Sequence, residues 1–117
     1  FIDHWANCWN AGDLESLSRL YDGDCRITSE SAIRWKGQHR PVRGRSEALA
    51  YWRDQYPVLS AALPFVPTME TWDGVFVFFV YRTKQDRYVL ERLELAPDSG
   101  LIVSAWGRRM DSLIATE

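Results

Sequence analysis

The clearest alternation of apolar and polar positions lies in residues 87–109. Two runs of strand-forming residues, RYVLERLEL and LIVSAWGRR, flank the turn-forming cluster APDSG, which predicts an antiparallel hairpin with a longer loop. If Leu95 pairs with Leu101, Glu91 shares a sheet face with Gly107, because side chains alternate between the two faces. The other members of that face are Val89, Leu93, Leu95, Leu101, Val103 and Ala105. A carboxylate among such neighbours is either a charge on a wet face or an acid group that lines a cavity.

Helical periodicity dominates the first half of the chain. Apolar residues at spacings of three and four predict amphipathic helices over Phe1–Asn10 and Leu14–Tyr21. Cys25–Glu30 then alternates as a short strand. Arg45–Tyr56 has one apolar side and predicts a third helix, which Pro57 ends.

The second half of the chain has the composition of strands. Ala62–Trp72 is a strand interrupted by proline, Val75–Arg82 is apolar on both faces, and Thr83–Asp86 is the turn that leads into the hairpin. The order is three helices and a short strand, then at least four antiparallel strands. This order predicts an α+β fold in which helices pack on one face of a curved sheet. The length is that of one domain, residues 1–117.

The apolar strand Val75–Arg82 needs cover on both faces. A turn of two or four residues at Lys84 would put its even-numbered residues, Phe76, Phe78 and Val80, on the Glu91 face. The opposite face then consists of Val75, Val77, Phe79, Tyr81, Tyr88, Leu90, Ile102 and Trp106. The helices can cover only one face, and a large exposed apolar face most commonly serves self-association. The sequence therefore predicts a homodimer with contacts at Val77, Phe79, Tyr81, Leu90 and Trp106.

Composition narrows the classes of partner and compartment. The net charge is −2, which argues against nucleic acid as the main partner, because phosphate binding needs an excess of basic residues. No apolar run approaches 18 residues, so no membrane span is expected. No secretion signal is visible, although the chain opens on Phe. We therefore expect a cytoplasmic protein.

Cysteine and histidine usage gives no sign of a metal or a disulfide. Cys8 and Cys25 lie in different predicted elements without metal-ligand spacing, and buried free thiols are favoured over a disulfide. His4 and His39 are far apart in the sequence and have few acidic neighbours, so no metal site is predicted. No cofactor is implied either.

A basic segment lies in residues 34–45. Its five cations, with no acid among them, are Arg34, Lys36, Arg40, Arg43 and Arg45. They form either an anion clamp or a solvated loop around a short strand. The loop is favoured, because Gly37, Pro41 and Gly44 interrupt the segment.

Several motifs resemble the nuclear transport factor two-like superfamily, which includes SnoaL-like polyketide cyclases and ketosteroid isomerases. They are Trp9-Asn10-Ala11-Gly12-Asp13-Leu14, then Leu17, Leu20-Tyr21 and Asp24, then Gly44 before a helix ending in Tyr51-Trp52, and the hairpin with Gly100-Leu101-Ile102-Val103-Ser104. The resemblance covers nearly the whole chain and implies a cone-shaped, cystatin-like fold. In that fold three helices close over a strongly curved sheet and leave a deep apolar pocket.

The resemblance also assigns roles to single positions. The catalytic Asp of ketosteroid isomerases falls on Ser29, their oxyanion-donating Tyr falls on Trp5, and their protonated sheet Asp falls on Glu91. Steroid isomerisation is not expected, because a serine cannot serve as the proton-shuttling base. Positions that line the cavity in the family fall on Tyr21, Tyr51, Trp52, Phe76, Phe78, Ala105 and Gly107.

Glu91 is the candidate catalytic residue, because an apolar cavity would raise its pKa towards neutrality. Its alternatives are an ion pair with Arg109, which falls on the same face, or a place at a wet rim. Trp5, Ser29 and Arg109 are candidate polar contacts of a ligand, and Trp5 is alternatively a core residue. Two functions remain open. The chain is an acid–base enzyme of isomerase, cyclase, hydrolase or dehydratase type acting on an apolar small molecule, or it is a non-catalytic ligand-binding or dimerisation module.

Overall fold

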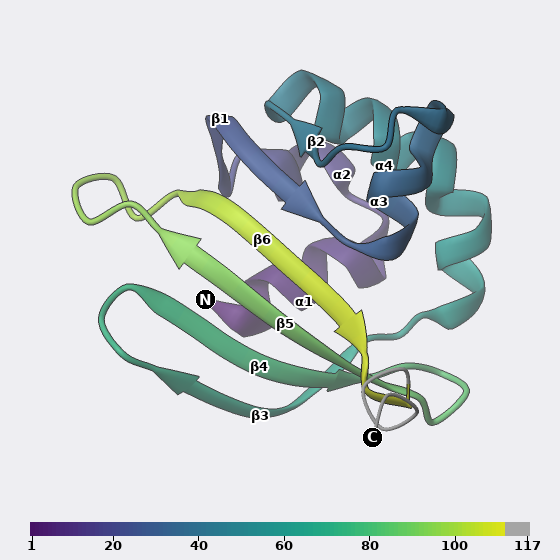
Figure 1. Ribbon diagram of the computed structural model, residues 1–117. Coiled ribbons are helices and arrows are strands. Elements are labelled where there is room, and N and C mark those ends of the chain that lie inside the picture. Colours follow the sequence, from purple (N-terminus) through teal and green to yellow (C-terminus); the bar gives the residue numbers. More distant parts are fainter. Residues whose placement is uncertain (112–117) are drawn as a thin grey trace.

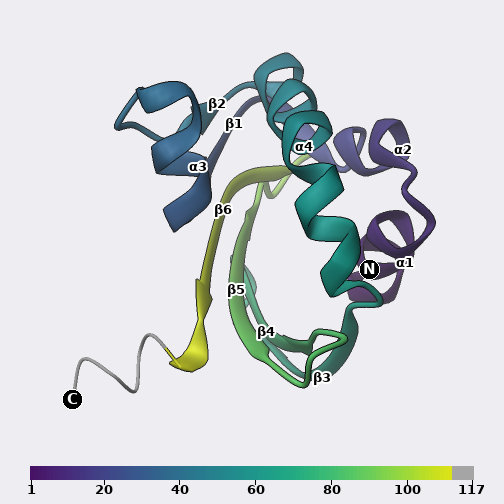
Figure 2. The ribbon, with the colours of Figure 1, turned by 90° about the vertical axis from the view of Figure 1, so that its right-hand side faces the viewer.

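The computed structural model describes residues 1–111, whose two longest helices lie against one face of a bent sheet (Figure 1). The helices are α1 (Ile2–Ala11), α2 (Leu14–Ser18), α3 (Glu30–Arg34) and α4 (Arg45–Leu59), with short 3-10 helices η1 (Trp35–Gly37) and η2 (Ser60–Ala62). The strands are β1 (Tyr21–Thr28), β2 (Val42–Arg43), β3 (Val66–Trp72), β4 (Phe76–Arg82), β5 (Tyr88–Leu95) and β6 (Ile102–Arg109). Their order in the sheet is β2-β1-β6-β5-β4-β3. Figure 2 shows the sheet curving around the side on which α1 and α4 lie, as the predicted α+β cone requires.

The junction between α1 and α2 forms as the sequence pattern predicts. Gly12 ends α1 in the left-handed conformation, with φ of 70°, and its amide donates to carbonyls of α1. Asp13 then caps α2, because its carboxylate accepts a hydrogen bond of 3.1 Å from the amide of Ser16. The Ser16 hydroxyl also donates to this carboxylate at 2.7 Å, and the hydroxyl bond and the amide bond together hold the pKa of Asp13 below its ordinary value.

Two predicted helix ends are wrong. The second helix ends at Ser18, and Tyr21 already belongs to β1. Pro57 does not end α4, which continues to Leu59. The hydrogen bond that Pro57 cannot make, to the carbonyl of Arg53, lies in the exposed last turns of the helix, where water can replace it.

The turn between β4 and β5 has an odd number of residues. The amide of Thr83 donates to the carbonyl of Arg87 at 2.8 Å, which leaves a three-residue loop whose last residue, Asp86, has φ of 56°. A three-residue loop that ends in a left-handed residue is a common way to close a hairpin. It sets Phe79, rather than an even-numbered residue of β4, opposite Glu91.

The predicted faces of β4 are therefore exchanged. Val77, Phe79 and Tyr81 point towards the helices and are buried, so their predicted role as dimer contacts is wrong. Phe76, Phe78 and Val80 lie on the outer face, and their predicted place on the Glu91 face is also wrong. Of the predicted dimer contacts, Leu90 and Trp106 do lie on the outer face, where both are half-buried.

Aromatic side chains fill the space between α1, α4 and the sheet. The Trp5 ring lies 5.0 Å from Phe79 and 5.5 Å from Tyr81, and the Trp52 ring lies 5.0 Å from Tyr21. Edge-to-face contacts of this kind favour a single well-ordered core. Cys8 and Cys25 are buried free thiols, as predicted. No helix among residues 1–111 combines the length and the apolar character that a membrane span needs.

Candidate functional site

Glu91 lies in the middle of β5, on the side of the sheet that faces the helices. Its neighbours across the sheet are Phe79 on β4 and Gly107 on β6. A Cβ atom at Gly107 would lie 3.0 Å from Cδ of Glu91 and would collide with its Oε1. The glycine therefore leaves the space that the carboxyl group occupies.

Neither a hydrogen bond nor an ion pair joins the Glu91 carboxyl to another residue within 1–111. Arg109, the predicted alternative partner, stands opposite Val89 at the exposed end of β6. Its guanidinium is 3.9 Å from the carboxylate of Asp111. The alternative pairing of Glu91 with Arg109 is thus wrong.

Burial raises the pKa of Glu91 to about 8. Low-dielectric surroundings disfavour the charged form, and no cation offsets this effect. At neutral pH the carboxyl group is therefore mostly protonated and can donate a proton or a hydrogen bond. The side chain nevertheless keeps some accessible surface, so it borders space rather than being sealed by packing.

Tyrosines from two strands, Tyr21 on β1 and Tyr81 on β4, approach this carboxyl group. Burial raises the pKa of Tyr21 and of Tyr81, and the charge of Glu91 raises both further. The Tyr21 hydroxyl accepts a hydrogen bond of 3.1 Å from Nε1 of Trp5. The Tyr51 hydroxyl shares a hydrogen bond with Ser31. The sequence pattern placed Tyr81 on the outer face. Its face depends on whether the β4–β5 turn has an odd or an even number of residues.

The remaining predicted site residues are divided between two sides of the sheet. Trp5, Trp52 and Ala105 belong to the buried core on the Glu91 side. The Ser29 hydroxyl caps α3 by accepting from the amide of Ala32 at 3.1 Å. Phe76 and Phe78 lie on the outer face, away from Glu91.

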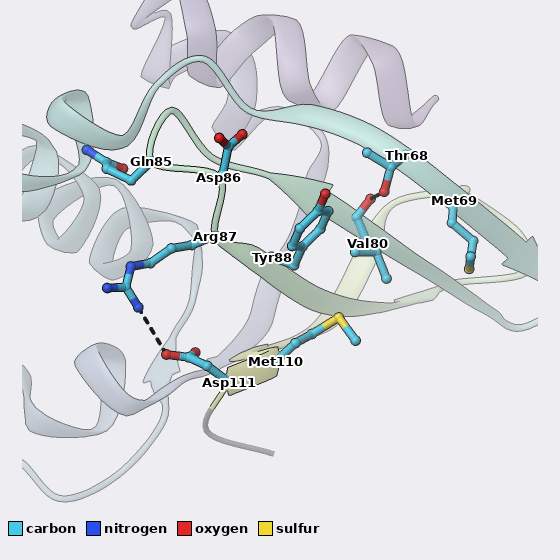
Figure 3. Close-up of a pocket in the computed structure, with 9 residues that line it drawn as sticks. All are labelled: Thr68, Met69, Val80, Gln85, Asp86, Arg87, Tyr88, Met110 and Asp111. Atoms are coloured by element: carbon cyan, nitrogen blue, oxygen red, sulfur yellow. Dashed lines mark hydrogen bonds and ion pairs between the residues drawn. The ribbon is translucent and has the colours of Figure 1, made fainter. Parts of the chain in front are cut away.

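A hollow of about 660 Å³ lies on the outer face, near the β4–β5 turn (Figure 3). It is lined by Thr68, Met69, Val80, Gln85, Asp86, Arg87, Tyr88, Met110 and Asp111. A smaller one of about 250 Å³ lies between the start of α1 and β3. Glu91 lines neither of them, so the deep pocket at Glu91 stays a prediction.

The basic segment does not form an anion clamp. Arg40 makes a two-point ion pair with Glu47, at 2.9 and 3.2 Å, and Arg45 donates to the carbonyl of Tyr21. Arg34 pairs with Glu30 on the exposed side of α3. Within the described part of the chain, no group of three or more His, Cys, Asp or Glu side chains is placed to hold a metal ion.

No protein-family model matches this chain, and no curated protein matches it in sequence. Solved structures match it in fold. A SnoaL-like protein of unknown function from Burkholderia thailandensis superimposes with a TM-score of 0.80 at 25% identity, over 93% of this chain and 91% of that one.

Two further matches carry a suggested activity. IdmH of Streptomyces antibioticus, a suggested polyketide cyclase, gives a TM-score of 0.70 at 19% identity over 98% of this chain and 93% of its own. A suggested polyketide cyclase from Sinorhizobium meliloti gives 0.71 at 15% identity over 92% of each chain. The likeness confirms the predicted cone-shaped fold.

Proposed function

We propose that this chain, which has the fold of the nuclear transport factor two-like superfamily, binds an apolar small molecule beside Glu91 and acts on it by acid–base chemistry. The observation that carries the proposal is the Glu91 carboxyl group itself. It is deep in the protein, has no partner among residues 1–111, and has its pKa raised to about 8. A carboxyl group held in this way is unfavourable for stability, and such groups concentrate at functional sites.

The chemistry follows from the protonation state. Below about pH 8 the neutral acid donates a proton to an oxygen atom of the ligand, and above it the carboxylate accepts one. The phenols of Tyr21 and Tyr81 stay neutral over the same range, because burial raises their pKa values. Proton transfer to or from oxygen, or the carbon next to it, begins isomerisation, cyclisation, hydrolysis and dehydration alike. The suggested cyclase activity of two structural neighbours supports this class.

Steroid isomerisation of the ketosteroid isomerase kind is not part of the proposal. Its catalytic base would fall on Ser29, whose hydroxyl is engaged as the cap of α3. A hydroxyl without a neighbouring base cannot shuttle a proton.

The experiment combines a titration with ligand binding. The pKa of Glu91 is measured by carboxyl-carbon NMR, and binding is measured with a panel of flat apolar ketones, alcohols and hydrocarbons. We expect a pKa near 8 and binding of at least one panel member by the wild type. Glu91→Gln and Gly107→Ala should weaken that binding, the second because a methyl group there displaces the carboxyl.

Gly23→Ala is the matched control for the glycine change. Gly23 also lies in a strand of the sheet, but a Cβ atom there meets nothing within 4 Å. It should leave both the titration and the binding unchanged. A Glu91 pKa near 4, together with no bound ligand, would refute the enzyme proposal.

A second candidate is a dimerisation module that uses the outer face of the sheet. Apolar side chains on or next to that face are solvent-exposed, among them Met69 and Tyr88, which are 70% and 44% exposed. Apolar area of this kind is typical of a partner surface. The two functions are compatible, because the Glu91 site and this surface lie on opposite sides of the sheet.

The proposed cellular compartment of the protein rests on the state of its cysteines. Cys8 and Cys25 are buried and unpaired. Two free thiols in a small domain favour a reducing compartment, and we place the protein in the cytoplasm.

A further inference from the structure

The hollow near the β4–β5 turn belongs to the face of the sheet that the chemistry proposed at Glu91 does not use. Three of the side chains that line it are neighbours in the sheet. Val80 on β4 pairs with Met69 on β3, and Tyr88 on β5 is its diagonal neighbour. Met69 and Tyr88 are solvent-exposed. A hollow lined in this way favours an apolar occupant, because covering it removes apolar surface from water.

Both methionines of the chain line this hollow. Met69 lies on β3, and Met110 follows the end of β6. Figure 3 shows the Met110 side chain directed along the hollow towards Val80. A thioether side chain is unbranched and polarizable, so it adapts to the shape of an apolar partner. The lining therefore suits branched apolar side chains such as those of leucine and isoleucine.

The chain itself leads into the hollow. Asp111, the last residue that the structure describes, lines it together with Met110. The Asp111 carboxylate is 3.1 Å from the guanidinium of Arg87 (Figure 3) and 3.9 Å from that of Arg109. These contacts place Asp111 at the rim, so the segment that follows starts beside the apolar side chains.

The segment that follows has the right composition and length. Residues 112–117 lie outside the described part of the chain and have the sequence Ser-Leu-Ile-Ala-Thr-Glu. An extended chain spans about 3.3 Å per residue, so Leu113 and Ile114 can reach about 7 and about 10 Å from Asp111. β4 is two strand spacings from β6, which is roughly 10 Å. Both side chains can therefore reach Val80.

The covalent connection favours this segment over a separate partner. A segment joined to its site by a few residues has an effective concentration in the millimolar range. A contact of only millimolar affinity is then enough to keep the segment bound for about half of the time. A separate molecule that made the same contact would need a millimolar concentration in solution.

We propose that residues 112–117 dock in cis on the outer face of the sheet, with Leu113 and Ile114 in the hollow. The docked segment covers the apolar side chains beside the β4–β5 turn. It leaves uncovered the part of the outer face around Arg92, between two aromatic rings. The inference does not depend on the chemistry proposed at Glu91, which lies on the opposite face of the sheet.

Nuclear Overhauser effects (NOEs) in the full chain test the contact. The wild type should give NOEs from the methyl groups of Leu113 or Ile114 to the ring protons of Tyr88. Met69→Glu should remove most of their intensity, because a charge in the hollow opposes the burial of apolar side chains beside it. Val58→Glu is the matched control, at a position of α4 as exposed as Met69, and should leave the NOEs unchanged.

Disulfide trapping decides in which molecule the segment docks. Val80→Cys is combined with Leu113→Cys in one variant and with Ile114→Cys in another. Under mild oxidation at least one pair should form a disulfide within a single chain in most molecules, as shown by peptide mapping and by a monomeric band on a non-reducing gel. Val58→Cys combined with Ile114→Cys should not form this bond, because α4 lies against the other face of the sheet (Figure 2).

The native thiols do not confuse this result, because Cys8 and Cys25 are buried. The proposal fails if the wild type shows no NOE between the segment and Tyr88, or if the Val58 pair forms as readily as the Val80 pairs. A disulfide that joins two chains also overturns it, and assigns the hollow to the segment of a second copy. None of these results bears on the chemistry proposed at Glu91, whose test is the titration and ligand binding given above.

Discussion

The carboxyl group of Glu91 couples the stability of the fold to pH. Its ordinary pKa is 4.5, whereas burial raises the pKa in the folded protein to about 8. Between these values the folded protein keeps a proton that the unfolded chain has lost. By linkage, the stabilising contribution of this proton is complete below pH 4.5 and is lost as the pH rises through 8, at no more than about 1.4 kcal/mol per pH unit.

Glu91→Gln should remove this dependence. The amide imitates the shape of the protonated acid and carries no charge at any pH. We expect the wild type to lose on the order of 2–4 kcal/mol of unfolding free energy between pH 5 and pH 8.5, and the variant to lose far less. Urea denaturation at several pH values measures the difference.

The control for this comparison is Glu15→Gln. The Glu15 side chain is 66% exposed and forms an exposed ion pair with Arg53, so this variant should follow the wild-type curve. If the unfolding free energies of wild type and Glu91→Gln ran parallel across the pH range, the carboxyl group would not be held in its neutral form.

Elements of the fold were predictable from the sequence to different degrees. Strand alternation correctly placed Glu91, Ala105 and Gly107 on one face, although Glu91 stands opposite Gly107, two residues further along β6 than the expected pairing gives. A shift of two preserves the faces of a strand, whereas a shift of one exchanges them. That is why the β5–β6 prediction survived around Glu91 and the β4–β5 prediction did not. Near the loop a bulge pairs Leu95 with Ile102 instead of Leu101, and Ile102, predicted on the outer face, is buried.

The candidate site was predictable only where local pattern decides it. Glu91 and Gly107 follow from alternation within one hairpin. Tyr81 depends on how many residues close a turn, and the bond between Trp5 and Tyr21 depends on how a helix packs on the sheet. Neither of these is encoded in the spacing of apolar residues along one element.

The conformation of Asp86 tests the role of the turn. Its φ of 56° is unfavourable for residues with a branched Cβ and is tolerated by Gly and Asn. Asp86→Val should lower the unfolding free energy by about 1–2 kcal/mol. Asp86→Gly and Asp86→Asn, the matched changes, should be nearly neutral in urea denaturation. An Asp86→Val variant as stable as Asp86→Asn would show that the turn tolerates another geometry.

At the scale of the whole molecule, the two faces of the sheet differ in character. The inner face is packed with aromatic rings against α1 and α4. On the outer face the guanidinium of Arg92 lies 5.3 Å from the Phe76 ring and 5.6 Å from the Trp106 ring. A cation between two aromatic rings covers part of the apolar surface and leaves Phe78, on the same strand as Phe76, half-exposed beside it.

Phe78→Glu should therefore separate the proposed dimer without unfolding the protomer. We expect wild type at micromolar concentration to sediment as a dimer and the variant to sediment as a monomer with an unchanged circular dichroism spectrum. The same change at Phe79, which is 1% exposed, should unfold the protein, because it buries a charge in the aromatic core. Val58→Glu, at a 71% exposed position of α4, is the control that should stay dimeric. A monomeric wild type would rule the dimer out, and dissociation of Val58→Glu would move the interface from the sheet to the helices.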